Sequence, residues 1–315
     1  MQPLSGGRLS FRFPRRGAIA LAALAAIVFA APATDLAAQD VLPEIKQRSD
    51  ELDVPFVPSD DNVLNAMFDM AKPTGGDFLI DLGSGDGRIV VEAARRFGLR
   101  GFGVDLNEGL VAIARQRARS AGVADRVEFH IRDLFRTDFR QASILTMYLL
   151  PEIVLELREA LLRDLRPGTR IVSHDYHLGE WRPDDGRIVR IGTGTEESVV
   201  YFWTVPAKVA GTWDWTIDSR KYADIPVDFR TVLRQHYQDI AADVTIFPGL
   251  GVSHDLRLSG TQISFSITGE IDERMVRHDF AGTVEGDRIT GTVTLGGAAH
   301  PLTLPWSAQR IKTAE

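Results

Sequence analysis

The chain has 315 residues, of which 44% are hydrophobic and 25% are charged; this composition is typical of a soluble globular protein with room for two domains. Its formal net charge of -7 argues against nucleic acid as a partner, because proteins that bind phosphate backbones usually carry an excess of positive charge. The chain contains no cysteine, which excludes disulfides, cysteine-ligated metals and thiol nucleophiles.

The first 38 residues have the pattern of an export signal. Arginines, including the adjacent Arg15 and Arg16, precede an apolar run over 18–31, and small residues suited to cleavage follow. The run is shorter than a membrane span usually needs. We therefore expect residues 1–38 to direct export to the periplasm or the medium. The alternative is a misassigned start codon in front of a cytoplasmic protein.

A polar stretch punctuated by prolines follows over residues 39–58 and predicts an extended lead-in. A helix should then begin after Ser59 or Asp60, either of which can cap it, because apolar residues recur at helical spacing up to Ala71. From residue 77 onward, apolar runs alternate with helical patterns. The expected strands are 78–83, 100–107, 126–133, 142–150, a run that ends near 175, 186–193 and 198–206.

Strands separated by helices predict a mostly parallel sheet that is covered by helices on both faces. The last two strands have no helix between them and should form an antiparallel edge hairpin. Residues 59–205 are therefore expected to form a seven-stranded, Rossmann-like α/β domain. Beyond Pro206, short alternating runs are separated by turns rich in glycine, aspartate and threonine, which predicts a separate all-β module over 206–315, either a small barrel or a sandwich.

A glycine-rich turn, DLGSGDGR, follows the first strand. Such a turn lets a cofactor approach the backbone, because glycine has no Cβ and readily takes a positive φ. Gly83, Gly85 and Gly87 have the spacing G-x-G-x-G, whereas a dinucleotide fold needs G-x-G-x-x-G. Asp81 at the end of the strand would repel a diphosphate and attract a cationic amino group. The turn therefore favours S-adenosylmethionine (SAM) over NAD or FAD.

Two more carboxylates stand at the ends of the next two strands. Asp105 lies 18 residues after Gly87, where a carboxylate can accept both ribose hydroxyls of SAM or of NAD. Asp133 is placed to meet the adenine edge. Each carboxylate alone could cap a turn or a helix, but open α/β sheets bind ligands at the carboxyl ends of their parallel strands.

Six stretches in order carry a resemblance to a known family: PFVPSDDNVLNAMFDMA, DLGSGDGRIVVEAARRFG, GFGVDLNEGLV, AGVADRVEFHIRDLF, TMYLLP and LRPGTRIVSHDYHLGEW. Together they resemble the class I SAM-dependent methyltransferases. Within these they resemble the group of mitochondrial lysine methyltransferases that modify the c-subunit of ATP synthase and the adenine nucleotide translocator, with bacterial and archaeal relatives. The resemblance covers roughly Val54 to Trp181 and does not reach the all-β module or the export signal.

The resemblance implies a SAM-dependent methyltransferase. The cofactor would be bound by Asp81, Gly83, Gly85, Gly87, Asp105 and Asp133, under an N-terminal lid that includes Phe56 and Ser59. Tyr148, Leu149 and Pro151 should border the methyl acceptor. The acceptor that the resemblance implies is a lysine amine of a protein, attacked by in-line displacement. A small-molecule acceptor and an exported binding protein without turnover are the alternatives.

A lysine acceptor must lose a proton before it can attack, either to solvent or to a nearby base. The candidates for the acceptor pocket are Tyr148, His174 and Asp175. The stretch SHDYHLGEW could also bind a metal, but His174 and Asp175 should point to opposite faces of a strand, so we expect no metal.

Four of the five tryptophans of the chain are candidates for an aromatic recognition surface, but we expect them to be buried as core. These are Trp181, Trp213, Trp215 and Trp306. The all-β module could select the substrate, form a dimer interface or hold the protein at a membrane surface, and the residues leave these alternatives and the oligomeric state open.

Overall fold

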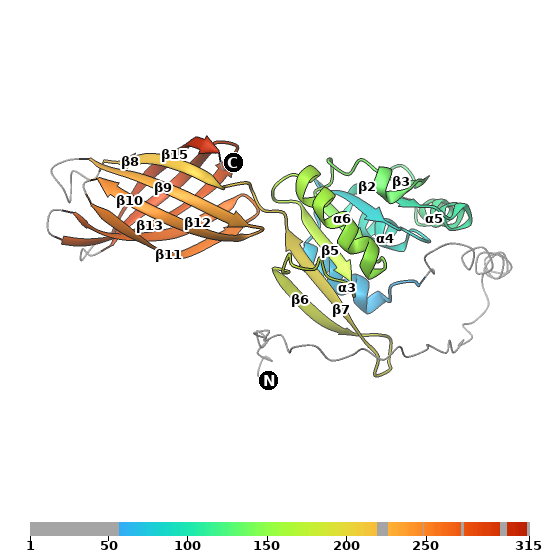
Figure 1. Ribbon diagram of the computed structural model, residues 1–315. Helices are drawn as coiled ribbons and strands as arrows, with labels where there is room; N and C mark the ends of the chain where they lie inside the picture. The colour runs from blue at the N-terminus through green and yellow to red at the C-terminus, as the bar shows by residue number, and fades with distance from the viewer. Residues whose placement is uncertain (1–56, 219–225, 248, 272–273, 297–300, 314–315) are drawn as a thin grey trace. The chain divides into compact units, whose positions relative to one another are not determined.

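The structure is a computed structural model that describes residues 57–218, 226–247, 249–271, 274–296 and 301–313. The expected export signal, most of the lead-in and Phe56 therefore lie outside the described residues. The described residues form a seven-stranded sheet with its helices and, after it in the chain, a closed barrel (Figure 1). No helix among them is both long enough and apolar enough to cross a membrane.

The seven-stranded sheet has the strand order β3-β2-β1-β4-β5-β7-β6. Strands β1 to β5 run parallel, whereas β7 is antiparallel to both β5 and β6, as the sequence predicted. The strands are β1 (Phe78–Leu82), β2 (Arg100–Asp105), β3 (Val127–Ile131), β4 (Ile144–Met147), β5 (Arg170–His174), β6 (Asp185–Arg190) and β7 (Glu197–Thr204).

Among the described residues, four α-helices and one 3-10 turn accompany this sheet: α3 (Asp61–Ala71), α4 (Arg88–Phe97), α5 (Glu108–Ser120), η1 (Leu134–Arg136) and α6 (Pro151–Asp164). Of the two expected caps, Asp60 is the one that begins α3, because its side chain accepts a hydrogen bond from Asn62 N at 2.8 Å. Strand β4 is shorter than expected. It ends at Met147, and residues 148–150 leave the sheet and lead into α6, which begins at Pro151.

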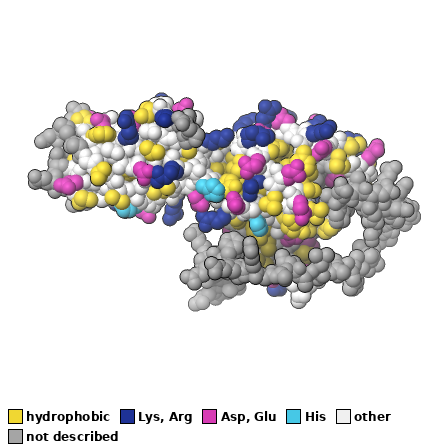
Figure 2. Space-filling model, viewed as in Figure 1, with side chains coloured by type: hydrophobic (Ala, Val, Ile, Leu, Met, Phe, Trp, Pro, Cys, Tyr) yellow, Lys and Arg dark blue, Asp and Glu magenta, His cyan; other side chains and the backbone are white. Residues whose placement is uncertain are grey.

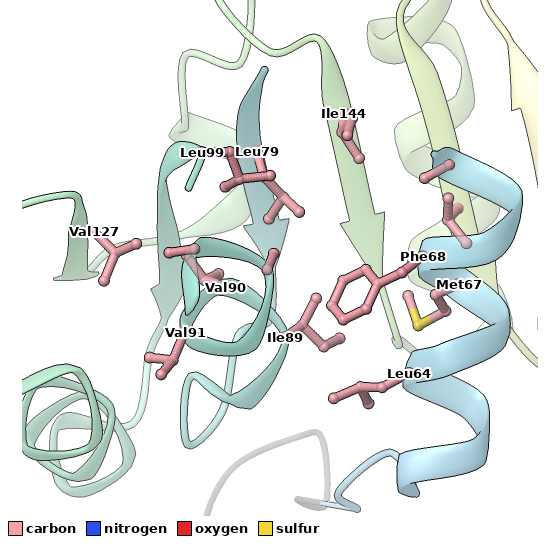
Figure 3. Packing of buried hydrophobic residues seen from close by; sticks show 14 of the residues in the cluster. Leu64, Met67, Phe68, Leu79, Ile89, Val90, Val91, Leu99, Val127 and Ile144 are labelled. Carbon is pink, nitrogen blue, oxygen red and sulfur yellow. The ribbon is translucent and has the colours of Figure 1, made fainter. Parts of the chain in front are cut away.

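The side chains of the central strand β1 alternate between the two faces of the sheet. Leu79 belongs to a buried cluster with residues of α3, α4 and α5, whereas Ile80 belongs to a second cluster with residues of α6. Figure 3 shows Phe68 of α3 pointing toward Ile89 of α4 within the first cluster. Both faces of the sheet are therefore buried, and the carboxyl ends of the strands are the edge left for a ligand.

The barrel closes because β10 pairs with both β9 and β11, and β15 pairs with both β14 and β8. Turns at Gly260 and Gly286, both with positive φ, connect β11 to β12 and β13 to β14, as the stretches LSGTQI and VEGDRI predicted. The strands are β8 (Gly211–Ile217), β9 (Val227–His236), β10 (Asp239–Phe247), β11 (Leu250–Ser259), β12 (Gln262–Ile271), β13 (Arg274–Glu285), β14 (Arg288–Gly296) and β15 (Leu302–Thr313).

The barrel interior is filled by apolar and aromatic side chains, and its tryptophans are core residues as predicted. Trp213, Trp215 and Trp306 are at most 6% exposed, and the ring of Trp215 stacks on Phe229 at a centroid distance of 5.3 Å. Trp181, in the core of the sheet domain, is fully buried. In Figure 2, charged side chains of both signs are dispersed over the barrel face in view. The barrel thus has an aromatic core and a mixed-charge exterior.

His278 lies in this aromatic interior and should make the barrel sensitive to acid. The residue is fully buried beside Phe229, and burial lowers its pKa to about 4, from 6.5 in the unfolded chain. The unfolded state therefore binds the extra proton as pH falls through this interval, and stability is lost. Leucine at this position cannot titrate, so His278→Leu should not suffer this loss. When the pH is lowered from 7 to 5, the unfolding free energy of the variant minus that of the parent should rise by about 2 kcal/mol.

Urea unfolding followed by tryptophan fluorescence at the two pH values measures this change. Substitution of the exposed His254, also in the barrel, is the matched control and should leave the pH dependence as in the parent. A difference between His278→Leu and parent that stays constant with pH would contradict the prediction.

Candidate active site

A cavity of about 370 Å³ lies where β1, β2 and β4 end. Its walls come from the glycine turn after β1, from residues 104–107 at the end of β2 and from residues 148–150 after β4. Residues 57–59, which precede α3, also line it. Segments that are far apart in the sequence therefore meet at the edge where open α/β sheets bind ligands.

The three predicted glycines of the turn all have positive φ, of 73° at Gly83, 52° at Gly85 and 75° at Gly87. A Cβ at Gly83 would lie 2.5 Å from the side chain of Leu149, and one at Gly87 would lie 2.7 Å from Phe129. The positive φ therefore favours glycine at both positions, and at Gly87 the buried Phe129 ring also leaves no space for a Cβ. The backbone N–H groups of Gly83 and Gly87 donate within the protein, to Val104 O and to Ser84 O, each at 2.9 Å. Gly83 and Gly85 line the cavity, whereas Gly87 is not among the lining residues.

Asp81 is buried at the end of β1 and lines the cavity. Its Oδ1 accepts a hydrogen bond from Thr146 Oγ1 at 2.7 Å, but its Oδ2 has no partner. Burial raises the pKa of this carboxyl to about 7, and the nearby charges of Asp105 and Asp86 add to the rise. A buried carboxylate oxygen without a partner is costly unless a ligand supplies a donor or a positive charge.

Asp105 holds the glycine turn in place from the end of β2. Its Oδ2 accepts from Gly85 N at 2.8 Å and its Oδ1 accepts from Asn107 N at 2.9 Å. The cap of the following helix is Asn107, whose Oδ1 accepts from Leu110 N at 3.1 Å. A carboxylate has about four lone-pair sites, so Asp105, which lines the cavity, can accept a further hydrogen bond.

Asp86, Arg88 and Arg117 form an ion cluster on the other side of the turn that the sequence reasoning missed. The Asp86 carboxylate accepts from Arg88 at 2.8 Å and from Arg117 at 2.6 Å. Burial would raise the pKa of Asp86, but these two arginines hold it below its usual value. Arg88 also donates to the backbone oxygen of Ser59 at 2.9 Å, so it ties the turn to the segment before α3.

The predicted acceptor residues divide into two groups. Tyr148 and Leu149 line the cavity, whereas Pro151 begins α6 and is not among the lining residues. Tyr176, which the sequence reasoning did not select, lines the cavity and stacks on Tyr148 with a centroid distance of 6.4 Å. Burial, with the charge of Asp175, raises the pKa of Tyr148 to about 12, so its phenol stays protonated at neutral pH.

His174 and Asp175 do not line the cavity but lie next to Tyr148. The ring of Tyr148 lies 3.8 Å from the ring of His174, and its hydroxyl donates to Asp175 Oδ2 at 3.3 Å. The expectation that the two residues point to opposite faces of a strand is wrong. Strand β5 ends at His174, and Asp175 leaves it with a φ of 63°, so both side chains reach the hydroxyl of Ser198.

The described residues contain no group of three or more His, Asp or Glu side chains that could bind a metal ion.

Among the other predicted residues, Ser59 is buried and lines the cavity. Asp133 caps η1, where its Oδ1 accepts from Phe135 N at 2.9 Å. Its neighbours Arg132 and Leu134 line the cavity and Asp133 itself does not, so a contact of its side chain with adenine stays a prediction.

The cavity has the chemistry that SAM requires. The unpartnered Asp81 Oδ2 suits the amino group, the free lone pairs of Asp105 suit ribose hydroxyls, and the wall holds two more buried polar atoms without partners, Ser84 Oγ and Asn107 Nδ2. A sheet with this strand order and this turn defines a class I SAM-dependent methyltransferase, and SAM is its cofactor.

Comparisons with known proteins give the family. Residues 81–185 match the model of the ANTKMT methyltransferase domain. The chain is 32% identical over 153 residues to a protein-lysine N-methyltransferase of Saccharolobus islandicus, a match that covers 48% of this chain and 94% of the relative. The chain belongs to this methyltransferase family.

Other similar proteins are matched over less of their length. The human lysine N-methyltransferase of the ATP synthase C-subunit is 35% identical over 131 residues, which cover 42% of this chain and 55% of the relative. The mouse adenine nucleotide translocase lysine N-methyltransferase is 34% identical over 151 residues, which cover 48% and 63%. The matches thus span less than two thirds of the length of these mammalian relatives. A solved RNA methyltransferase from Salinibacter ruber, in complex with S-adenosyl-L-homocysteine (SAH), is 45% identical, covers 49% of this chain and 96% of that one, and has a TM-score of 0.45.

Proposed function

We propose that this methyltransferase modifies the side-chain amine of a lysine in a protein substrate. The observation that carries the proposal is the acceptor wall, where the rings of Tyr148 and Tyr176 line the cavity and the Asp175 carboxylate lies behind them. Aromatic faces and a nearby carboxylate attract a cation and so favour a lysine side chain over a neutral acceptor. The names of the relatives, which are protein-lysine methyltransferases, support the same acceptor.

SAM supplies a methyl group bonded to a positively charged sulfur. The work of the chain is to hold the acceptor amine in line with that methyl group and to exclude water. Tyr148 is not the base, because its phenol is protonated and donates to Asp175. Its oxygen keeps lone pairs that can accept an N–H of the amine. The lysine proton then leaves to solvent before the transfer, so that at saturating SAM the rate should rise with pH through the neutral range.

The test is incorporation of labelled methyl from SAM into lysine-containing proteins, with hydrolysates analysed for methyl-lysine. We expect label in lysine, and none after the lysines of the substrate have been chemically acetylated. Label that appears only in small molecules would contradict the lysine proposal. Tight SAH binding without transfer to any acceptor would instead support an exported binding protein that retains the fold.

We also propose that residues 1–38 export the protein and that it meets its substrate outside the cytoplasm. The arginine-led apolar run over 18–31 supports this part.

We propose in addition that the protein associates with a membrane surface. Phe247, Leu250 and Met275 support this, because they are exposed apolar residues near the β10–β11 and β12–β13 connections. Fractionation of cells and sedimentation with lipid vesicles test the two parts. Full-length protein found only in the cytoplasm would contradict export, and protein that does not sediment with vesicles would contradict membrane association.

A further inference from the structure

A line of buried and part-buried hydrogen bonds runs from the acceptor wall to the segment before α3. Tyr148 donates to Asp175 Oδ2 at 3.3 Å, and Asp175 Oδ1 accepts from Ser198 Oγ at 2.7 Å. The same hydroxyl lies 2.7 Å from His174 Nε2, and His174 Nδ1 lies 2.9 Å from Ser59 Oγ. The line joins residues that are more than a hundred positions apart in the sequence.

The protons along this line have one self-consistent arrangement. A carboxylate only accepts, so the Ser198 hydroxyl donates to Asp175. The Ser198 oxygen then accepts from Nε2 of His174, which leaves Nδ1 to accept from the hydroxyl of Ser59. Burial holds the pKa of His174 below its usual value although Asp175 opposes the shift, and a neutral imidazole has the one donor and one acceptor that this arrangement needs.

Ser59 is also connected to the cofactor side of the cavity. Its backbone oxygen accepts from Arg88 at 2.9 Å, and Arg88 is paired with Asp86 in the glycine turn. The short segment 57–59, which lines the cavity, is therefore held at two points. One leads to the glycine turn through Arg88, and the other leads to the acceptor wall through His174.

Asp175, at the centre of this line of hydrogen bonds, has a strained backbone conformation. Asp175 has a φ of 63°, in a region that costs a residue with a side chain about 1 kcal/mol or more. Two hydrogen bonds with the backbone of Val199 hold it there, one from Asp175 N to Val199 O at 2.7 Å and one from Val199 N to Asp175 Oδ1 at 2.9 Å. The strained conformation lets one carboxylate meet both Tyr148 and Ser198.

We propose that Ser59, His174 and Ser198 are positioning residues that hold the 57–59 segment and the Tyr148 wall as one unit. The hydrogen bonds would then fix the position of the 57–59 segment, on the cofactor side, relative to the Tyr148 ring, on the acceptor side. This would align the methyl group of the cofactor with the acceptor amine. The expected effect on catalysis rests on the proposed methyl transfer. The linkage between the segment and the ring depends only on the residues of this chain.

The test is Ser198→Ala, with Ser198→Thr as the variant that keeps the hydroxyl. The matched control is Ser173→Ala, because Ser173 is fully buried on β5 and its Oγ has no partner. Amide hydrogen exchange over residues 57–64, with and without SAH, reads the linkage directly. We expect exchange to rise about tenfold in Ser198→Ala, and to stay near the parent value in Ser198→Thr and Ser173→Ala.

The kinetic expectation is a fall of kcat by about tenfold in Ser198→Ala, with Kd for SAH within about threefold of the parent, because Arg88 still holds Ser59. If Ser198→Ala does not fold, Ser59→Ala breaks the other end of the line and retains the Arg88 contact. Exchange unchanged from the parent, or raised equally in Ser173→Ala, would overturn the proposal. The exchange measurements need no methyl acceptor. They therefore test the linkage even if the proposal that the acceptor is a lysine proves wrong.

Discussion

Asp81→Asn should weaken SAM binding strongly and at the same time stabilise the ligand-free protein at pH 8. The Asp81 carboxyl is buried with an unpartnered oxygen, and burial raises its pKa to about 7, from 3.8 in the unfolded chain. The folded state therefore binds the extra proton between these values, and stability falls as pH rises from about 4 through 7. The full loss is as much as about 4 kcal/mol, and asparagine, which does not ionise, should avoid it.

The same titration predicts how ligand binding depends on pH. A cationic amino group binds the ionised form of Asp81, so SAH affinity of the parent should fall about tenfold per pH unit below pH 7. Calorimetry at pH 6, 7 and 8 measures this fall, and Asp81→Asn should weaken binding at pH 8 by at least about a hundredfold. Asp125→Asn, at a carboxylate that is 75% exposed, is the control and should change neither quantity.

Urea unfolding of the ligand-free proteins at pH 5 and pH 8 gives the stability part of the test. The gain of Asp81→Asn over the parent should be about 2 to 3 kcal/mol larger at pH 8 than at pH 5. Two results would contradict the assignment of Asp81 to the cofactor amino group. One is SAH affinity at pH 8 that the substitution leaves near the parent value, and the other is an affinity of the parent that does not change between pH 6 and pH 8.

Asp105→Ala is expected to reduce SAM affinity by about a hundredfold or more, because it removes two acceptors for the ribose and two bonds within the site. The lost internal bonds are those from Gly85 N and Asn107 N, which position the glycine turn and the start of α5. Asp105→Asn, which keeps one acceptor oxygen and nearly the same volume, should lose less. Calorimetry with SAH measures both variants, with circular dichroism to verify folding.

Asp133→Ala is the informative comparison for Asp105. Its carboxylate caps η1 and is not among the cavity-lining residues, so we expect its loss to change SAH affinity by less than about tenfold. Equal effects at Asp105 and Asp133 would contradict this ranking of the two carboxylates. In that case adenine recognition by the Asp133 side chain would explain the result better than the observed cap.

Local pattern was sufficient to predict the sheet domain. Apolar runs that alternate with helical spacing predicted the parallel strands, and the absence of a helix between 186–193 and 198–206 predicted the antiparallel hairpin that β6 and β7 form. The glycines at 83, 85 and 87 were recognisable because each has to satisfy a backbone requirement that is local to its own turn. Asp81 and Asp105 could be selected because the ends of parallel strands meet at one edge.

Features that depend on partners distant in the sequence could not be predicted in this way. Whether the all-β module is a barrel or a sandwich depends on pairing of strands such as β8 and β15, which lie almost a module apart in the sequence. Asp175 was placed on the wrong side because its positive φ is imposed by Val199 on another strand, not by its own neighbours. Ser59 was expected to cap a helix or cover the cofactor, and its bond to His174 became visible only when folding brought the two side chains together. Periodicity reports the local preferences of the backbone, whereas buried polar bonds depend on which segments the whole fold makes neighbours.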